Sequence, residues 1–177
     1  SAERDGIHLG EGAACLLLER DGEGPAAVLS VGESSDAHSM SAPHPEGLGA
    51  RAAIRVALDR AGLSATDIDY VNAHGTGTDQ NDAAERAALH ALVPGVPVSS
   101  TKGLTGHTLG ACGALEAIIT VLAMQHGALP PNAGALPVDA SLPVNVVTAL
   151  RPARIRHALS NSFAFGGSNA VLALGAT

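Results

Sequence analysis

The sequence predicts an α/β fold in which helices cover both faces of a β-sheet. Short apolar runs, typical of buried strands, alternate along the chain with stretches of helical period. Hydrophobic residues make up 46% of the 177 residues and aromatic residues only 2%, so the core must consist mainly of small aliphatic side chains. A chain of this length can form one sizeable domain with a real interior.

The first part of the chain predicts two strands followed by a helix. The apolar run at 13–18 is typical of a buried strand, and residues 25–35 form a second strand after the turn "DGEGP". No helix separates them, so they resemble the end of an earlier sheet. A helix is expected at 46–61 and ends at Gly62. Its apolar positions follow the helical period: Ala50, Ala53, Ile54, Ala57, Leu58 and Ala61.

Regular strand and helix units follow. Strands are expected at 68–73, 96–101 and 144–149, and two more within 158–174, joined at a glycine turn. One helix is expected from Asp82 to about Leu92. A second, at 107–126, is apolar nearly all round and should be buried.

Composition excludes several classes of protein. A formal charge of −7 argues against nucleic acid as a partner. The basic cluster Arg151, Arg154, Arg156 and His157 is read as a solvated loop in preference to a docking patch. Cys15 and Cys112 lack a CxxC pattern, so no disulfide framework or zinc site is expected. The segment 109–125 contains Glu116 and is short for a membrane span, and no signal peptide opens the chain. The cytoplasm is the expected compartment.

The first motif is "HGTGT" at 74–78, at the end of a predicted strand. Its glycines allow a ligand to approach the backbone, and the hydroxyls of Thr76 and Thr78 offer hydrogen bonds. The alternative is a tight turn without function. In α/β sheets ligands gather beyond the strand ends. His74 could therefore face a site shared with the next strand.

The second motif is "STKGLTGHTLGACGALEA" at 100–117. A lysine after a buried strand is costly without a carboxylate partner, and Glu85 and Glu116 are the candidates for Lys102. Alternatively, Glu85 completes a capping box with Asp82 as the N-cap. Glu116 would then be a partly exposed flank of its helix.

The third motif is "SNSFAFGGSNA" at 160–170. Backbone N–H groups near Gly166 and Gly167 could form an anion-binding nest. A plain hairpin between two core strands explains the same residues.

Together and in this order, the three motifs resemble the C-terminal half of elongating beta-ketoacyl-acyl carrier protein synthases, which have the thiolase fold. The upstream "RDGIHLGEGAACLLLE" and "APHPEG" match as well, so the resemblance covers nearly the whole chain. It implies a layered α/β/α architecture. Residues 1–40 would be the terminal strands of the N-terminal half, and residues 41–177 the C-terminal domain.

The resemblance also implies a reaction, a decarboxylating Claisen condensation between an acyl thioester and malonyl-acyl carrier protein in fatty acid or polyketide-type biosynthesis. His74 and His107 match the family's histidine pair, Lys102 its lysine, and Glu85 the acidic position. Further matching positions fall into three groups: phosphopantetheine contacts (Thr76, Thr78), the gate and oxyanion hole (Phe163, Phe165), and a structural monovalent or divalent cation in some members (Asn72, Glu85, Glu116, Ser160, Asn161). No cofactor is required, because the phosphopantetheine arm arrives on the carrier protein.

The largest departure from the family is the nucleophilic cysteine, whose motif does not occur here. Cys15 is expected inside a strand, and Cys112 at a packing position. The chain alone should therefore be inactive, and we expect it to be one piece of a longer enzyme. Its implied partners are the cysteine-bearing half, an acyl carrier protein, and a second ketosynthase-type subunit in a homodimer or heterodimer. Smaller departures are Ala164, which would stiffen the gate if φ were positive there, and Asp79 in place of proline.

Two other functions remain as alternatives. The first is a non-catalytic partner that resembles a chain-length factor, although the retention of His74, Lys102 and His107 speaks against it. The second is a metal enzyme that uses the chain's scattered histidines, whose spacing fits no HExxH-type pattern. Those histidines are His38, His44, His74 and His107.

Overall fold

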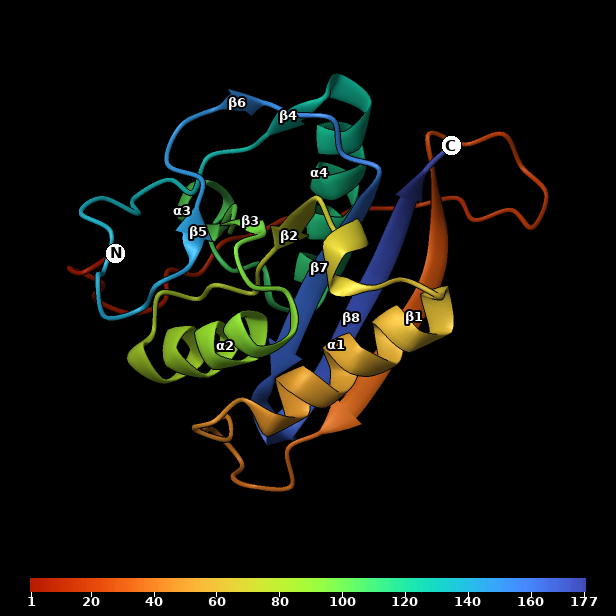
Figure 1. Ribbon diagram of the computed structural model, residues 1–177. Coiled ribbons are helices and arrows are strands. Elements are labelled where there is room, and N and C mark those ends of the chain that lie inside the picture. The colour runs from red at the N-terminus through yellow and green to blue at the C-terminus, as the bar shows by residue number, and fades with distance from the viewer.

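A six-stranded sheet forms the centre of the protein in the computed structural model, which describes residues 1–177 (Figure 1). Its strands in spatial order are β1 (Ala26–Ser35), β8 (Ser168–Ala176), β7 (His157–Ala164), β2 (Tyr70–Asn72), β3 (Pro97–Ser99) and β5 (Asn145–Val146). β1, β8 and β7 are antiparallel neighbours, whereas β7, β2, β3 and β5 run parallel. The parallel part has its carboxyl ends at one edge, where ligands bind in such sheets.

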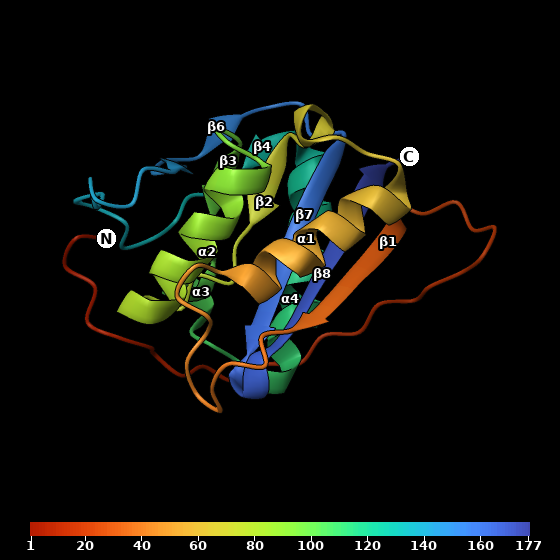
Figure 2. The same ribbon diagram turned by 60° about the horizontal axis from the view of Figure 1, so that its bottom comes forward.

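Helices cover both faces of this sheet, as the sequence predicts (Figure 2). α1 (Leu48–Ala61) and α2 (Asp79–Leu92) share one face, and α4 (Cys112–His126) packs on the other against β7 and β8. Each face has its own buried cluster of aliphatic side chains. The short helix α3 (Lys102–Thr105) follows β3, and a two-stranded ribbon pairs β4 (Ala128–Leu129) with β6 (Arg151–Pro152).

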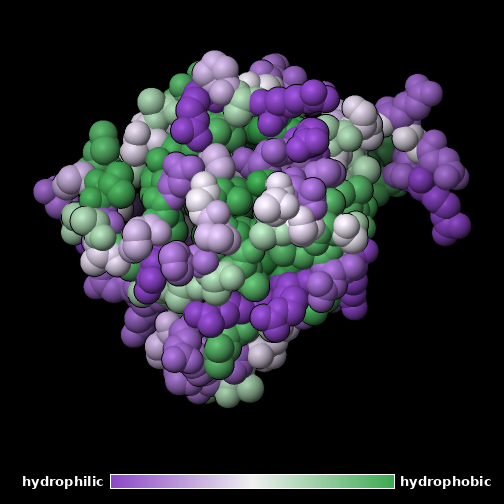
Figure 3. Space-filling model, in the orientation of Figure 1, coloured by the Kyte–Doolittle hydropathy of each residue, from purple (hydrophilic) through white to green (hydrophobic).

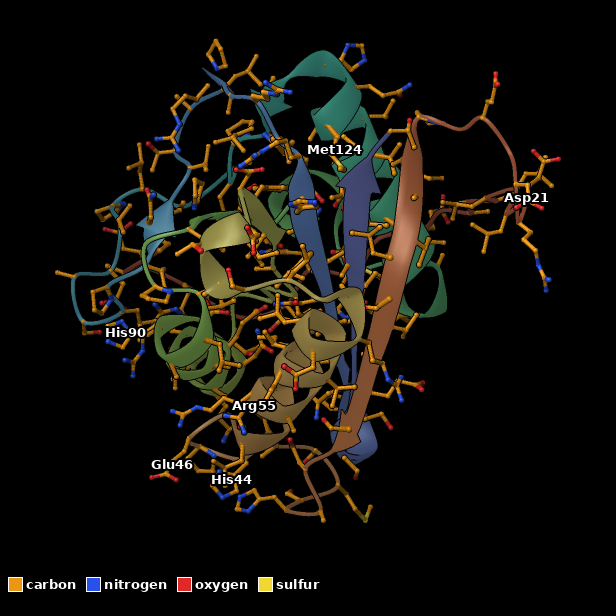
Figure 4. The ribbon with its side chains drawn as sticks, turned by 45° about the vertical axis from the view of Figure 1, so that its right-hand side comes forward. Asp21, His44, Glu46, Arg55, His90 and Met124 are labelled. Carbon is orange, nitrogen blue, oxygen red and sulfur yellow. The ribbon has the colours of Figure 1, made fainter.

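The helical period of α1 places its small side chains on the sheet. Ala53, Ile54 and Ala57 are fully buried, while Arg55 points away from the sheet (Figure 4). Gly62 ends the helix in a left-handed conformation, with φ at 66°, and its N–H bonds to the carbonyl of Asp59. This part of the prediction is confirmed.

The predicted strand at 13–18 is wrong. The run forms no strand, and Leu17 and Leu18 are 86% and 73% exposed. An apolar run forms a strand only where a neighbouring strand pairs with it, and no strand of this chain pairs with this run. The loop that follows projects from the body with a hydrophilic tip (Figure 3). Cys15 is consequently exposed rather than held within a strand.

Two helix predictions need correction at their starts. α2 begins at Asp79 with Thr78 as its N-cap, three residues earlier than expected, so Asp82 lies inside its first turn. α4 begins at Cys112 after a short 3-10 turn at Leu109–Ala111. It is also less buried than its apolar sequence predicts, because Leu122 is 44% exposed.

The α4 region is long and apolar enough to cross a membrane by length and composition, contrary to the prediction from its sequence. The segment Leu109–His126 has a mean hydropathy of 1.4 over 18 residues, and 33% of it is buried. A core helix of a globular protein meets the same criteria. This helix packs on the sheet, with Met124 against the aliphatic cluster on that face (Figure 4), and carries Glu116 on its buried side.

Candidate functional site

The ends of β2 and β3 bring the first two motifs together. "HGTGT" follows β2, and "STKG" follows β3, its parallel neighbour. The rings of His74 and His107 lie with centroids 5.3 Å apart and planes at 83°, edge to face. The two histidines, 33 positions apart in sequence, therefore form one pair.

Hydrogen bonds fix which nitrogen of each ring carries the proton. The backbone N–H of Leu109 donates to Nδ1 of His107 over 3.1 Å. Nζ of Lys102 lies 3.4 Å from Nδ1 of His74, and an ammonium can only donate. Both Nδ1 atoms are therefore acceptors. In the neutral state both rings carry their proton on Nε2 and can donate it to a ligand.

Burial keeps both rings neutral. Desolvation, followed by the charge of Lys102 and the neighbouring His107, lowers the pKa of His74 to about 2. Desolvation and the Lys102 charge also lower the pKa of the more exposed His107. At neutral pH the pair thus offers uncharged donors, which suit an oxygen that becomes negative during a reaction.

Lys102 is buried and forms an ion pair with Glu116, so Glu116 is the carboxylate partner that the sequence left open. Their side chains are 5% and 2% exposed, and Nζ donates to Oε1. Burial raises the pKa of Glu116, while the Lys102 charge opposes that rise. The alternative of a partly exposed Glu116 is wrong, because it faces the sheet from α4. The pair holds Lys102 beside His74.

Glu85 stabilises the backbone of the histidine loop instead of completing a capping box. Its Oε1 accepts from the N–H of His74 over 2.8 Å, and its Oε2 from the N–H of Gly75 over 2.9 Å. Nδ2 of Asn161 donates to the same carboxylate. Burial raises the pKa of Glu85, and these three hydrogen bonds act in the opposite direction. Glu85 therefore orients the backbone of the loop that carries His74.

A cavity of about 330 Å³ opens beside the pair. Its wall includes His107, Lys102, Glu85 and Thr76. His74 is not part of that wall; its ring lies behind, against the ring of His107. The hydroxyls of Thr76 and Thr78 hydrogen-bond to one another over 2.9 Å. Thr76 lines the cavity, whereas Thr78, the N-cap residue of α2, lies beside it and outside the wall.

The two phenylalanines of the third motif lie in different surroundings. The ring of Phe163 is 5.9 Å from that of His74, whereas Phe165 is 81% exposed. The N–H of Gly166 donates to the carbonyl of Met40, so it is not available to the anion-binding nest that the sequence left open. Ala164 has φ at −127°, so alanine causes no strain there. The glycine turn joins β7 to β8 as a hairpin.

Several predicted cation ligands retain free oxygens. Oδ1 of Asn72, Oδ1 of Asn161 and Oε2 of Glu116 are buried without a hydrogen-bond partner. Ser160 is also buried, opposite Asn72 in the β2–β7 pairing. Unpartnered buried oxygens are costly, and oxygen is the ligand that hard cations prefer.

The remaining candidates lie elsewhere. Cys112 is buried at the start of α4. The ring centroids of His38 and His44 lie 5.0 Å apart, in the loop between β1 and α1. No three His, Cys, Asp or Glu side chains lie close enough to hold a metal ion, so the four-histidine alternative lacks a ligand cluster. The basic cluster at 151–157 is mostly exposed, and Arg156 pairs loosely with Asp69 at 3.8 Å, as a solvated loop would.

A layered α/β sheet with paired histidines beyond neighbouring strand ends is the arrangement of a thiolase-like fold, which solved ketosynthase structures share. The model of the beta-ketoacyl synthase C-terminal domain matches residues 25–135. The chain belongs to the beta-ketoacyl synthase family.

Relatives and solved structures agree. The 3-oxoacyl-[acyl-carrier-protein] synthase 2 of Rhizobium meliloti is 42% identical over 98% of this chain, and this chain covers 44% of that protein. The structure of a ketosynthase in complex with its chain length factor from Xenorhabdus doucetiae matches with a TM-score of 0.82 at 48% identity, over 88% of this chain and 40% of that one. A type II polyketide ketosynthase, in complex with its acyl-carrier protein, matches with a TM-score of 0.83 at 26% identity, over 86% and 38% of the two chains. The chain thus spans less than half the length of these proteins.

Sequence reasoning missed two residues beside the site. Arg4 and Asp139 both line the cavity and form an ion pair with each other. Arg4 lies in the quoted segment "RDG", which could have drawn attention to it. Nothing in the sequence around Asp139 indicates that it lies near the histidines, because the long segment after α4 carries no regular period.

Proposed function

We propose that this chain supplies the decarboxylation and oxyanion machinery of a ketosynthase that condenses an acyl thioester with malonyl-acyl carrier protein. The observation that carries the proposal is the pair of neutral imidazoles, each with its Nε2 proton free, of which His107 lines a cavity and His74 packs against the ring of His107. Two such donors suit a thioester carbonyl oxygen that becomes negative.

In the proposed reaction, each bond that forms is matched by a bond that breaks. The bond between the malonyl carboxylate and its neighbouring carbon breaks, carbon dioxide leaves, and the electrons flow into the thioester carbonyl. The Nε2 protons of His74 and His107 stabilise the resulting enolate. Its carbon then attacks the acyl thioester, a carbon–carbon bond forms, and the carbon–sulfur bond to the cysteine breaks, leaving a thiolate.

Neighbouring residues set the tautomer of His74 and the position of its ring. Lys102, held by Glu116, keeps His74 in the tautomer that donates from Nε2, and Glu85 fixes the backbone on either side of the ring. We assign Thr76 and Thr78 to the phosphopantetheine arm. Phe163 and Phe165 are assigned to the gate, with Phe163 the one that contacts His74.

The acyl group is carried by a cysteine on a second half of the enzyme. Exposed aliphatic residues offer a surface for that half, among them Leu9, Leu17 and Leu109 at 70%, 86% and 62% exposure. We retain the division into 1–40 and 41–177 as a proposal, although β1 joins the sheet of the second part. The carrier protein, a second ketosynthase-type subunit and the cytoplasm complete the expected setting.

A structural cation is a further part of the proposal. The free oxygens of Asn72, Glu116 and Asn161 fit an ion with hard ligands, whereas both oxygens of Glu85 already accept hydrogen bonds. Amide oxygens suit a monovalent or alkaline-earth ion better than a transition metal. The ion would link β2, β7 and α4. Thermal unfolding in potassium, compared with a bulky organic cation, tests this through the stabilisation that binding confers.

The experiment that tests the function uses the enzyme completed with its cysteine-bearing half. His74→Ala or His107→Ala should lower malonyl decarboxylation by about two to three orders of magnitude, the effect of removing one oxyanion donor. Acyl loading of the cysteine should remain close to that of the wild type. Equal loss of both steps would show that the substitutions had damaged the fold.

The chain-length-factor-like alternative predicts a different result. A structure in complex with a chain length factor is among the similar proteins, so this alternative has a specific basis. Such a partner needs neither the Lys102–Glu116 pair nor the free Nε2 protons. Labelling of the completed protein by iodoacetamide or cerulenin supports the enzyme, and no labelling supports the partner.

A further inference from the structure

The first ten residues form an extended segment across the site, here called the N-terminal strap (residues 1–10). The N–H of Ala2 donates to the carbonyl of Pro137 over 2.8 Å at one end. At the other end the strap joins the His107 loop: the N–H of His107 donates to the carbonyl of His8 over 2.7 Å, and the N–H of Gly10 to the carbonyl of His107 over 3.0 Å. Between these ends, residues 3–8 form part of the cavity wall.

Arg4 fastens the strap to two other segments through three carboxylates. Its Nη1 lies 3.2 Å from Asp79, its Nε 3.3 Å from Asp82 and its Nη2 2.5 Å from Asp139. The Arg4 side chain is 13% exposed, and those of Asp82 and Asp139 are 19% and 17% exposed, whereas that of Asp79 is 86% exposed. A guanidinium can contact several carboxylates at once because its donors are arranged in a planar fork. Single surface ion pairs contribute little, but a network of this kind is an exception.

The network continues into the loop that carries His74. Asp82 also accepts a hydrogen bond from the N–H of Gly77 over 3.3 Å, so Arg4 is linked to the "HGTGT" backbone through one carboxylate. The strap contacts the same glycine directly: a Cβ at residue 77 would lie 2.9 Å from the carbonyl oxygen of Gly6. At the opposite end, a Cβ at Gly106 would lie 2.8 Å from Gly10. Glycine at these places lets the strap lie against both loops.

We propose that Arg4 is a positioning residue that fixes the strap and, through it, the spacing between the Thr76 loop and His107. The inference rests on the proposed function, because that spacing matters only if both loops act on one substrate. A misplacement of about 1 Å can lower a rate by two orders of magnitude. Without Arg4 the strap loses its attachment to α2 and to the Asp139 segment, and the carboxylates of those two segments are left to repel one another.

The first test is amide hydrogen exchange on the protein itself. Arg4→Ala should speed exchange at Gly77 and His107 by about tenfold or more, while buried amides such as that of Ala57 in α1 keep their rates. Arg20→Ala is the matched control, since Arg20 is exposed and forms no ion pair. Unchanged exchange at both sites in Arg4→Ala overturns the proposal.

A second variant distinguishes loss of the ion-pair network from simple unfolding. The network predicts that the effect of Asp139→Asn on the exchange rate reverses direction when Arg4 is absent. Asp139→Asn alone removes one attraction and should speed exchange at Gly77. In the Arg4→Ala background the same substitution removes one of three like charges and should slow exchange relative to Arg4→Ala. An Asp139→Asn effect in the same direction in both backgrounds contradicts the network.

Kinetics of the completed enzyme then separate this inference from the proposed function. Arg4→Ala should lower kcat/KM for malonyl-carrier decarboxylation by about tenfold or more, leave acyl loading unchanged, and be only partly rescued by Arg4→Lys. If wild type decarboxylates and Arg4→Ala matches it, the positioning role is refuted. A wild-type enzyme without decarboxylation refutes the function and leaves the exchange results to decide whether the strap is fastened by Arg4.

Discussion

Acid should destabilise this fold through His74 in a way that can be calculated. Below pH 6.5 the unfolded chain takes up a proton at this histidine, whereas the folded protein, with the pKa of His74 lowered to about 2, does not. Protons therefore favour the unfolded state, and the free energy of unfolding falls as the pH decreases from 6.5 towards 2. From pH 7.5 to pH 5 the loss attributable to His74 alone is about 2 kcal/mol.

Urea unfolding followed by circular dichroism at both pH values measures this loss. Other groups titrate too, and the raised pKa values of Glu85 and Glu116 act with the opposite sign. The informative quantity is thus the difference between wild type and His74→Gln, since both contain the other groups. His90→Gln is the control, because His90 points into solvent from α2 (Figure 4).

The wild type should lose about 2 kcal/mol more than His74→Gln over this range, and His90→Gln should behave as the wild type. Equal pH dependence in wild type and His74→Gln would refute the argument, because it would mean that the ring takes up its proton as easily in the fold as in the unfolded chain.

Three further predictions concern the same core. Lys102→Met leaves the carboxylate of Glu116 buried without its partner and should cost about 3–5 kcal/mol in unfolding experiments, with Glu116→Gln in that background recovering part of it. His107→Ala should lower decarboxylation about a hundredfold or more without a comparable loss of stability, because this residue is only half-buried. Tyr70 is the sole tyrosine, and burial raises its pKa despite its hydrogen bond to Ser99, so its near-ultraviolet absorbance should show ionisation only when alkali unfolds the protein.

The sequence predicted those parts of the fold that depend on residues close together in the chain. The period of α1 and the glycine that ends it were sufficient to place that helix, and the parallel strand ends were sufficient to bring "HGTGT" and "STKG" to one edge. Sequence reasoning failed where a strand-like run has no partner strand in this chain. The run at 13–18 has the pattern of a strand, yet no neighbouring strand pairs with it.

In the candidate site, too, the sequence indicated some residues, whereas one contact became clear only from the packed structure. The ordered motifs indicated His74, Lys102 and His107, and a buried lysine required a carboxylate. They could not choose between Glu85 and Glu116, because that choice depends on which helix faces which side of the sheet. Glu85 comes from α2 on one face and Glu116 from α4 on the other, so only the packed structure assigns the ion pair.

Nitrogen NMR of the ring-labelled protein at neutral pH is the most direct test of the central claim. The account predicts that His74 and His107 are both uncharged, each with an unprotonated Nδ1 and a proton on Nε2. An imidazolium at either position, or a proton on Nδ1, would contradict it, since the two rings could then not donate from Nε2 as neutral partners to one oxygen.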